Sequence, residues 1–179
     1  GNGVVAPDFT TNGMANWNVQ FPTWIPGFDP QSHPENLNQA EMYTLIAAYY
    51  PESKIAQYTT AWDSNQAWFY NVQLNTKNPE LWNLTDPVWC DWHRQMLDYA
   101  SYTAAQAPNY RYYIASGEKH TILMWPEFYT ENSAGIPFIS WVQAMVSNPF
   151  GPEGPELQGR WRNLECQDCG DPLEDCSNP

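Results

Sequence analysis

Helical and strand-forming patterns of hydrophobic residues alternate along the middle of the chain. The first helical pattern begins at Asn38, which has capping-box spacing to Glu41. It continues as a stripe of apolar residues, Met42, Leu45, Ile46 and Tyr49, and Pro51 is expected to end the helix. Residues 54–62 are rich in Thr and Tyr and have no helical stripe, so they predict a strand.

The same alternation repeats further along the chain. Residues 65–74 predict a helix, and Asp86-Pro87 predicts the start of another, with Asp86 as the N-cap and Pro87 in the first helical position. This helix should end before Pro108, and residues 110–115 predict a second strand.

The pattern closes with a helix predicted over residues 136–147, whose apolar face consists of Phe138, Ile139, Val142, Met145 and Val146. Strands that alternate with helices predict an α/β fold with a mostly parallel sheet flanked by helices. We therefore divide the chain into an aromatic and Pro-rich loop region (1–37), an α/β region (38–148) and a Cys-containing Pro/Gly tail (149–179).

The loop region 1–37 has two interpretations. Its aromatic residues could form a wall or lid over a substrate cleft, or they could pin the loop itself against the core. The second interpretation is favoured, because loops usually run over the surface and are held by their own apolar side chains.

Charge and composition narrow the class of partner. The 179 residues carry 20 Asp and Glu against seven Lys and Arg, a net charge of -13. Such a surface repels phosphate backbones, so we expect no nucleic-acid partner. The absence of a run of about 18 apolar residues predicts no membrane span. The low Lys content and the many Asn, Gln, Thr and aromatic residues favour a secreted protein, extracellular or periplasmic.

The chain opens at Gly1 without a signal peptide, so we expect it to start at a processed or internal end.

The four cysteines suggest either disulfides or a metal. Cys166, Cys169 and Cys176 crowd the tail, whereas Cys90 stands alone. Cys-x-x-Cys is a zinc-ligand spacing. No second such pair is present, however, so we favour two disulfides in an exported protein, with at least one bond inside the 166–176 cluster. No group of Asp, Glu and His has metal-ligand spacing either, and we expect no cofactor and no metal.

Two polar residues follow the two predicted strands. Asp63 comes directly after the first strand, and His120 follows the second after a turn at residues 116–119. Active sites of parallel sheets lie at the carboxyl ends of the strands, so both residues should meet at one edge. An Asp followed by a His in this order supplies two members of a Ser-Asp-His triad.

The third member is missing from the chain. A nucleophilic serine should precede Asp63, but no Gly-x-Ser-x-Gly occurs anywhere. The only earlier serines are Ser32, in a Pro-rich loop, and Ser53, in a turn, and neither has the small flanking residues of a strained nucleophile turn.

Two segments of the chain resemble the pectin acetylesterase family, which includes the Notum carboxylesterases. They are Asp63-Ser64-Asn65-Gln66 and the stretch Gly117-Glu118-Lys119-His120-Thr121-Ile122-Leu123. The stretch from Phe128 to Val142 resembles the segment after the family histidine, closest to bacterial members. The similarity covers residues 40–165.

The resemblance implies the C-terminal portion of an α/β-hydrolase fold and ester hydrolysis, with Asp63 as triad acid and His120 as general base. It places the serine upstream, so we expect an N-terminal chain of the same precursor to carry the nucleophile and to stay packed against this one. The substrate implied is an ester, with acetylated polysaccharide as one candidate. The acidic surface and the abundant aromatics suit a neutral or apolar ester better.

Less specific interpretations stand beside these. Asp63 is also a good helix N-cap, and His120 could be an ordinary loop histidine. His93 is expected to be a core or boundary histidine, and His33 a solvent-exposed loop residue. The alternative function is a non-catalytic surface or assembly protein that retains a hydrolase scaffold.

Overall fold

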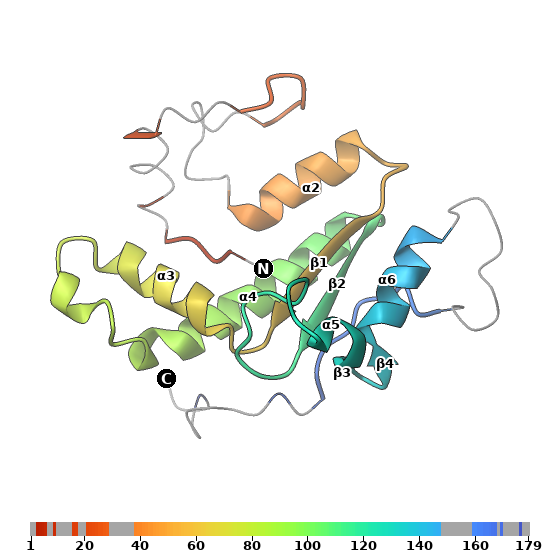
Figure 1. The fold of residues 1–179 in the computed structure, drawn as a ribbon. Coiled ribbons are helices and arrows are strands. Elements are labelled where there is room, and N and C mark those ends of the chain that lie inside the picture. Colours follow the sequence, from red (N-terminus) through yellow and green to blue (C-terminus); the bar gives the residue numbers. More distant parts are fainter. Residues whose placement is uncertain are drawn as a thin grey trace.

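The computed structural model describes residues 3–6, 9, 16–17, 21–28, 38–147, 159–167, 169 and 176. Their main elements, in chain order, are α2 (Gln39–Tyr49), β1 (Ile55–Thr60), α3 (Ser64–Leu74), η2 (Pro79–Leu81), α4 (Asp86–Gln106), β2 (Tyr110–Ala115), α5 (Glu127–Thr130), β3 (Asn132–Ser133), β4 (Ile136–Pro137) and α6 (Phe138–Val146) (Figure 1). Helices and strands are mixed around a small parallel sheet, as an α/β chain requires.

The sheet is built on the parallel pairing of β1 with β2. The register runs from Ile55 opposite Tyr110 to Thr60 opposite Ala115. The other edge of β2 is occupied by the tail. The Leu164 amide donates to the Tyr112 carbonyl at 3.0 Å, and the Leu164 carbonyl accepts from the Ile114 amide at 2.8 Å. The sheet order is therefore β1, β2 and then the segment around Leu164.

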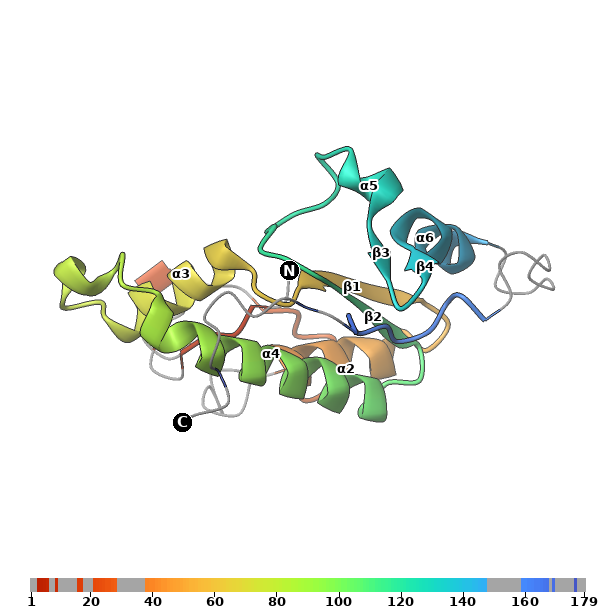
Figure 2. The ribbon, with the colours of Figure 1, turned by 90° about the horizontal axis from the view of Figure 1, so that it is seen from below.

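Helices cover both faces of these strands. Figure 2 shows α2 and α4 on one side and α5, α6 and the β3–β4 hairpin on the other. The first side is filled by buried aromatic and apolar residues that include Trp92, Met96 and Tyr110. The second side is filled by Tyr113, Phe138 and Trp141, among others. Burial of large apolar side chains on both faces is the main stabilising term of the fold.

The capping box predicted for the first helix is present. Asn38 Oδ1 accepts from the Glu41 amide at 3.0 Å, and Glu41 Oε2 accepts from the Asn38 amide at 3.1 Å. The small residues Ala40 and Ala47 are the ones that α2 buries.

The apolar stripe of α2 packs on the loop region instead of on the sheet. Met42, Leu45 and Ile46 contact Ile25 and Phe28, which are buried in a small cluster of their own. For residues 21–28 this packing agrees with the loop that is held by its own apolar side chains. Most of the loop region, including Ser32 and His33, lies outside the described residues.

Two helix predictions need correction. Thr85, and not Asp86, is the N-cap residue of α4, so the helix begins with Asp86 already in its first turn. The last helix begins at Phe138, because the two preceding residues pair with Asn132–Ser133 in a hairpin. Its buried residues are Phe138, Trp141 and Ala144, whereas Val146 is 69% exposed.

All four cysteines form disulfides, Cys90–Cys176 and Cys166–Cys169. The preference for disulfides is thus confirmed, and one bond lies inside the tail cluster as expected. No thiolate is left to bind zinc. None of the helices in the described part of the chain is long and apolar enough to cross a membrane.

The two disulfides should differ in their effect on stability. Cys90–Cys176 joins residues 86 positions apart and Cys166–Cys169 residues three apart, and a longer loop constrains the unfolded chain more strongly. We expect the double variant C90S/C176S to lose about 2–4 kcal/mol of unfolding free energy in urea denaturation. The matched control C166S/C169S should lose clearly less. Equal losses would contradict the loop-entropy explanation.

Candidate active site

The two residues predicted at the strand ends form a hydrogen-bonded pair. His120 Nδ1 lies 3.0 Å from Asp63 Oδ2 and 3.1 Å from Asp63 Oδ1. The Asp63 side chain is fully buried, and the His120 side chain is 31% exposed. An ionised carboxylate only accepts hydrogen bonds, so Nδ1 carries the proton. In the neutral ring, Nε2 is then the nitrogen free to accept a proton.

Asp63 is fixed by the helix that follows it. Its Oδ1 caps α3 by accepting from the Gln66 amide at 2.9 Å. The amide groups at a helix N-terminus also favour a negative charge at that position. The N-cap interpretation of Asp63 is therefore correct, and the same carboxylate also orients His120.

Hydrogen bonds between the two strand-end loops set the position of His120. The Trp62 amide donates to the Gly117 carbonyl at 3.1 Å, and the Ser64 amide donates to the Glu118 carbonyl at 3.2 Å. The Thr60 hydroxyl adds a bond to the Lys119 carbonyl at 3.0 Å. These bonds extend the contact between the two strands up to the residue before His120. Gly117 permits the turn, because its φ is +80°.

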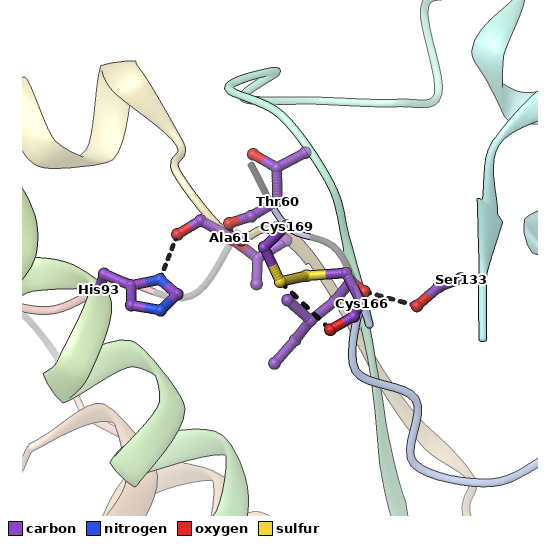
Figure 3. The surroundings of a disulfide bond; sticks show 8 residues. Thr60, Ala61, His93, Ser133, Cys166 and Cys169 are labelled. Atoms are coloured by element: carbon purple, nitrogen blue, oxygen red, sulfur yellow. Dashed lines mark hydrogen bonds between the residues drawn. A yellow bond between two sulfur atoms is a disulfide. The ribbon is translucent and has the colours of Figure 1, made fainter. Parts of the chain in front are cut away.

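Helix α4 supports the other side of the Asp63 loop. His93 Nδ1 is 2.6 Å from the Ala61 carbonyl oxygen (Figure 3). The His93 ring also stacks on Trp62, with centroids 4.0 Å apart. Trp89 Nε1 donates to the Trp62 carbonyl at 3.2 Å. His93 is thus the boundary histidine that was expected, and it also positions the residues before Asp63. This positioning role was not predicted from the sequence, although the four-residue spacing of Trp89 and His93 places both on one helix face.

Two cavities meet at His120. The larger, of about 570 Å³ and called the polar cavity below, is lined mainly by polar and charged residues, which include Ser64, Ser116, Glu118, Lys119, Glu127 and Glu131. The smaller, of about 310 Å³, is lined mainly by apolar side chains from the sheet, α6 and the loop after His120. The exposed edge of the imidazole therefore borders both a polar and an apolar space.

Carboxylates dominate the charge of the polar cavity. Lys119 forms an ion pair with Glu127, and that hydrogen bond lowers the pKa of Glu127. Partial burial raises the pKa of Glu131. Glu118 adds a third carboxylate, so one lysine faces three acidic groups. This balance disfavours an anionic ligand.

No nucleophile is paired with His120 within the described residues. The ring's only hydrogen-bond partner there is Asp63. Ser64 lies nearby, but its hydroxyl faces the Glu118 carbonyl at 3.4 Å. Ser53 precedes β1, so it lies near the amino-terminal end of the strand, whereas Asp63 lies past its carboxyl end. For a six-residue strand, these two ends are about 20 Å apart.

Comparisons of the chain with models of protein families, with characterised proteins and with solved structures gave no match. The resemblance to the pectin acetylesterases therefore stays an expectation drawn from the sequence.

Gly117 should be more important for the site than for the fold. A Cβ at Gly117 meets no atom within 4 Å, so G117A acts only through its positive φ, at a cost of about 1–2 kcal/mol. Gly135 has a φ of +76° and equally open space in the β3–β4 turn, which makes G135A a matched control. Both variants should lose similar unfolding free energy, but only G117A should shift the NMR signals of the His120 ring. Unchanged His120 signals in G117A would show that the turn does not position the histidine.

Proposed function

We propose that this chain supplies the acid and the general base of a serine-type carboxylic ester hydrolase. The supporting observation is the buried Asp63 carboxylate bonded to the partly exposed His120 at the carboxyl ends of two adjacent parallel strands. Nδ1 is held by Asp63, and the His120 side chain lines both cavities.

The chemistry follows from the roles of the two side chains. Nε2 would take the proton of a serine hydroxyl as its oxygen attacks the ester carbonyl, and would then return that proton to the leaving alcohol. Water would next attack the acyl-enzyme, give its proton to Nε2 and release the acid, and the proton would return to the serine. Asp63 would hold the imidazole in the required tautomer and stabilise its charged form.

The free edge of β1 is the place where we propose that the serine enters. The amides of Ile55 and Ala61 bond toward β2, so the intervening Ala56, Tyr58 and Thr60 direct their backbone groups to the other side. No backbone group among the described residues pairs with them there. The outer edge of β2, by contrast, is occupied by the tail.

A strand paired in parallel with β1 would have its carboxyl end beside that of β1, which Asp63 follows. The loop after that strand would then lie near His120, which is where a nucleophile is needed. We propose that this strand belongs to an N-terminal segment of the same precursor and that the complete sheet is of the α/β-hydrolase type. The two disulfides support an extracellular or periplasmic location, because disulfides persist in oxidising compartments.

Asp63→Asn in the complete assembly tests this function. The Asn side chain keeps an oxygen for the Gln66 amide, so α3 stays capped and the fold survives. It stabilises the wrong imidazole tautomer, a change that lowers kcat about 10⁴-fold in serine-hydrolase triads. Hydrolysis of p-nitrophenyl acetate by the assembly should fall by a comparable factor.

Asp91→Asn is the matched control, since Asp91 is a carboxylate on α4 that binds Tyr70 and Gln95. It should leave hydrolysis unchanged. A serine-reactive phosphonate should label the partner segment and leave this chain unlabelled. Full activity of D63N would contradict the proposal. An assembly without any hydrolysis would favour the non-catalytic scaffold.

A further inference from the structure

The smaller cavity beside His120 is lined mainly by apolar and aromatic side chains. The residues that line it include Tyr58 of β1 and Phe138, Val142 and Met145 of α6, and the Tyr58 and Phe138 rings are in edge contact with centroids 4.9 Å apart. Ile122, from the loop after His120, also lines it. The described lining residues include no carboxylate, lysine or arginine.

This cavity was not predicted from the sequence, because Val142 and Met145 were placed on the apolar face of a helix. The apolar face predicted for the last helix contained Phe138, Val142 and Met145, but of these α6 buries only Phe138, together with Trp141 and Ala144. Val142 and Met145 are only partly buried and line open space. An apolar space that the chain's own described side chains leave unfilled is suited to an apolar ligand group.

The mouth of the cavity is apolar as well. Leu123 lines the cavity and is 79% exposed, and the adjacent Met124 is 83% exposed. Exposed apolar residues that are contiguous with a cavity mark a binding surface more often than isolated ones do. These two residues lie three and four positions after His120 in the chain, so the exposed apolar surface belongs to the same loop as the candidate catalytic base.

The two cavities have opposite character and share His120 and Thr121. An ester bond held at His120 would therefore have its two sides in different surroundings. One side would lie among apolar residues, and the other among the carboxylates of Glu118, Glu127 and Glu131.

We infer that the apolar cavity binds a medium-length alkyl or aryl group on one side of the ester, while the polar cavity takes a neutral or cationic group on the other. This inference rests on the proposed function and specifies its substrate class. A volume of about 310 Å³ corresponds to roughly ten water-sized groups, far more than an acetyl group occupies. The cavity therefore has room for a group much larger than acetyl on one side of the ester.

Binding of 2-alkanones, from butanone to decanone, tests the cavity without any chemistry. These ketones are neutral, and nothing in the site hydrolyses them. Titration into the full chain should shift the ¹³C-methyl signal of Met145 and leave that of Met96, buried in the other core, unchanged. The dissociation constant should fall about fourfold per added methylene until the cavity is full.

Two variants should weaken this binding. Ala56 is exposed on β1 and lines the cavity, so A56W should obstruct it and raise the dissociation constant at least tenfold. A105W, at an exposed position on α4, is the matched control and should not change binding. L123S removes an exposed side chain at the mouth and should weaken binding of the longest ketones severalfold without affecting folding.

The inference fails if affinity does not depend on chain length, or if Met145 does not respond. It also fails if the ketones bind the single chain but not the complete assembly, because the partner segment would then fill the cavity. Loss of hydrolysis in D63N without ketone binding would leave the proposed function intact and remove only the substrate class. Ketone binding with full D63N activity would overturn the proposed function, and the cavity's assignment to an ester substrate with it.

Discussion

The parallel pairing of β1 with β2 is the interaction on which the site depends. It brings together Asp63 and His120, which are 57 residues apart in the chain. The pairing does not stop at the strand ends, because Ala61 and Trp62 still donate to carbonyl groups of the second strand and its turn. The register of the sheet is therefore transmitted to the two loops, and the Asp–His distance follows from it.

Helix α4 links the stability of the fold to the geometry of the site. Trp92 and Met96 are fully buried beneath the sheet, while Trp89 and His93 contact the residues just before Asp63. Cys90, the residue after Trp89, attaches the tail to the same helix. Disturbance of α4 is thus expected to reach the strand end as well as the core.

The sequence predicted elements best where local signals agreed. Residues 110–115 form β2 with the predicted bounds, because a run of aromatic and β-branched residues lies between a helix-ending Pro and a Ser-Gly turn. The meeting of Asp63 and His120 was predictable because the carboxyl ends of parallel strands share an edge. Features that depend on tertiary packing could not be predicted from the sequence. The face of α6, the pairing of Leu164 from a Pro/Gly-rich tail and the apolar cavity all depend on neighbours that no local pattern specifies.

Capping alone does not account for Asp63. Ser or Asn would cap α3 about as well without placing a charge out of contact with water. A fully buried carboxylate loses its hydration, a cost of several kcal/mol unless its oxygens are hydrogen-bonded. The Gln66 amide satisfies one oxygen, and among the described residues only the His120 ring is placed to satisfy the other. The charge and the imidazole therefore stabilise each other, and neither side chain has a sufficient structural reason without its partner.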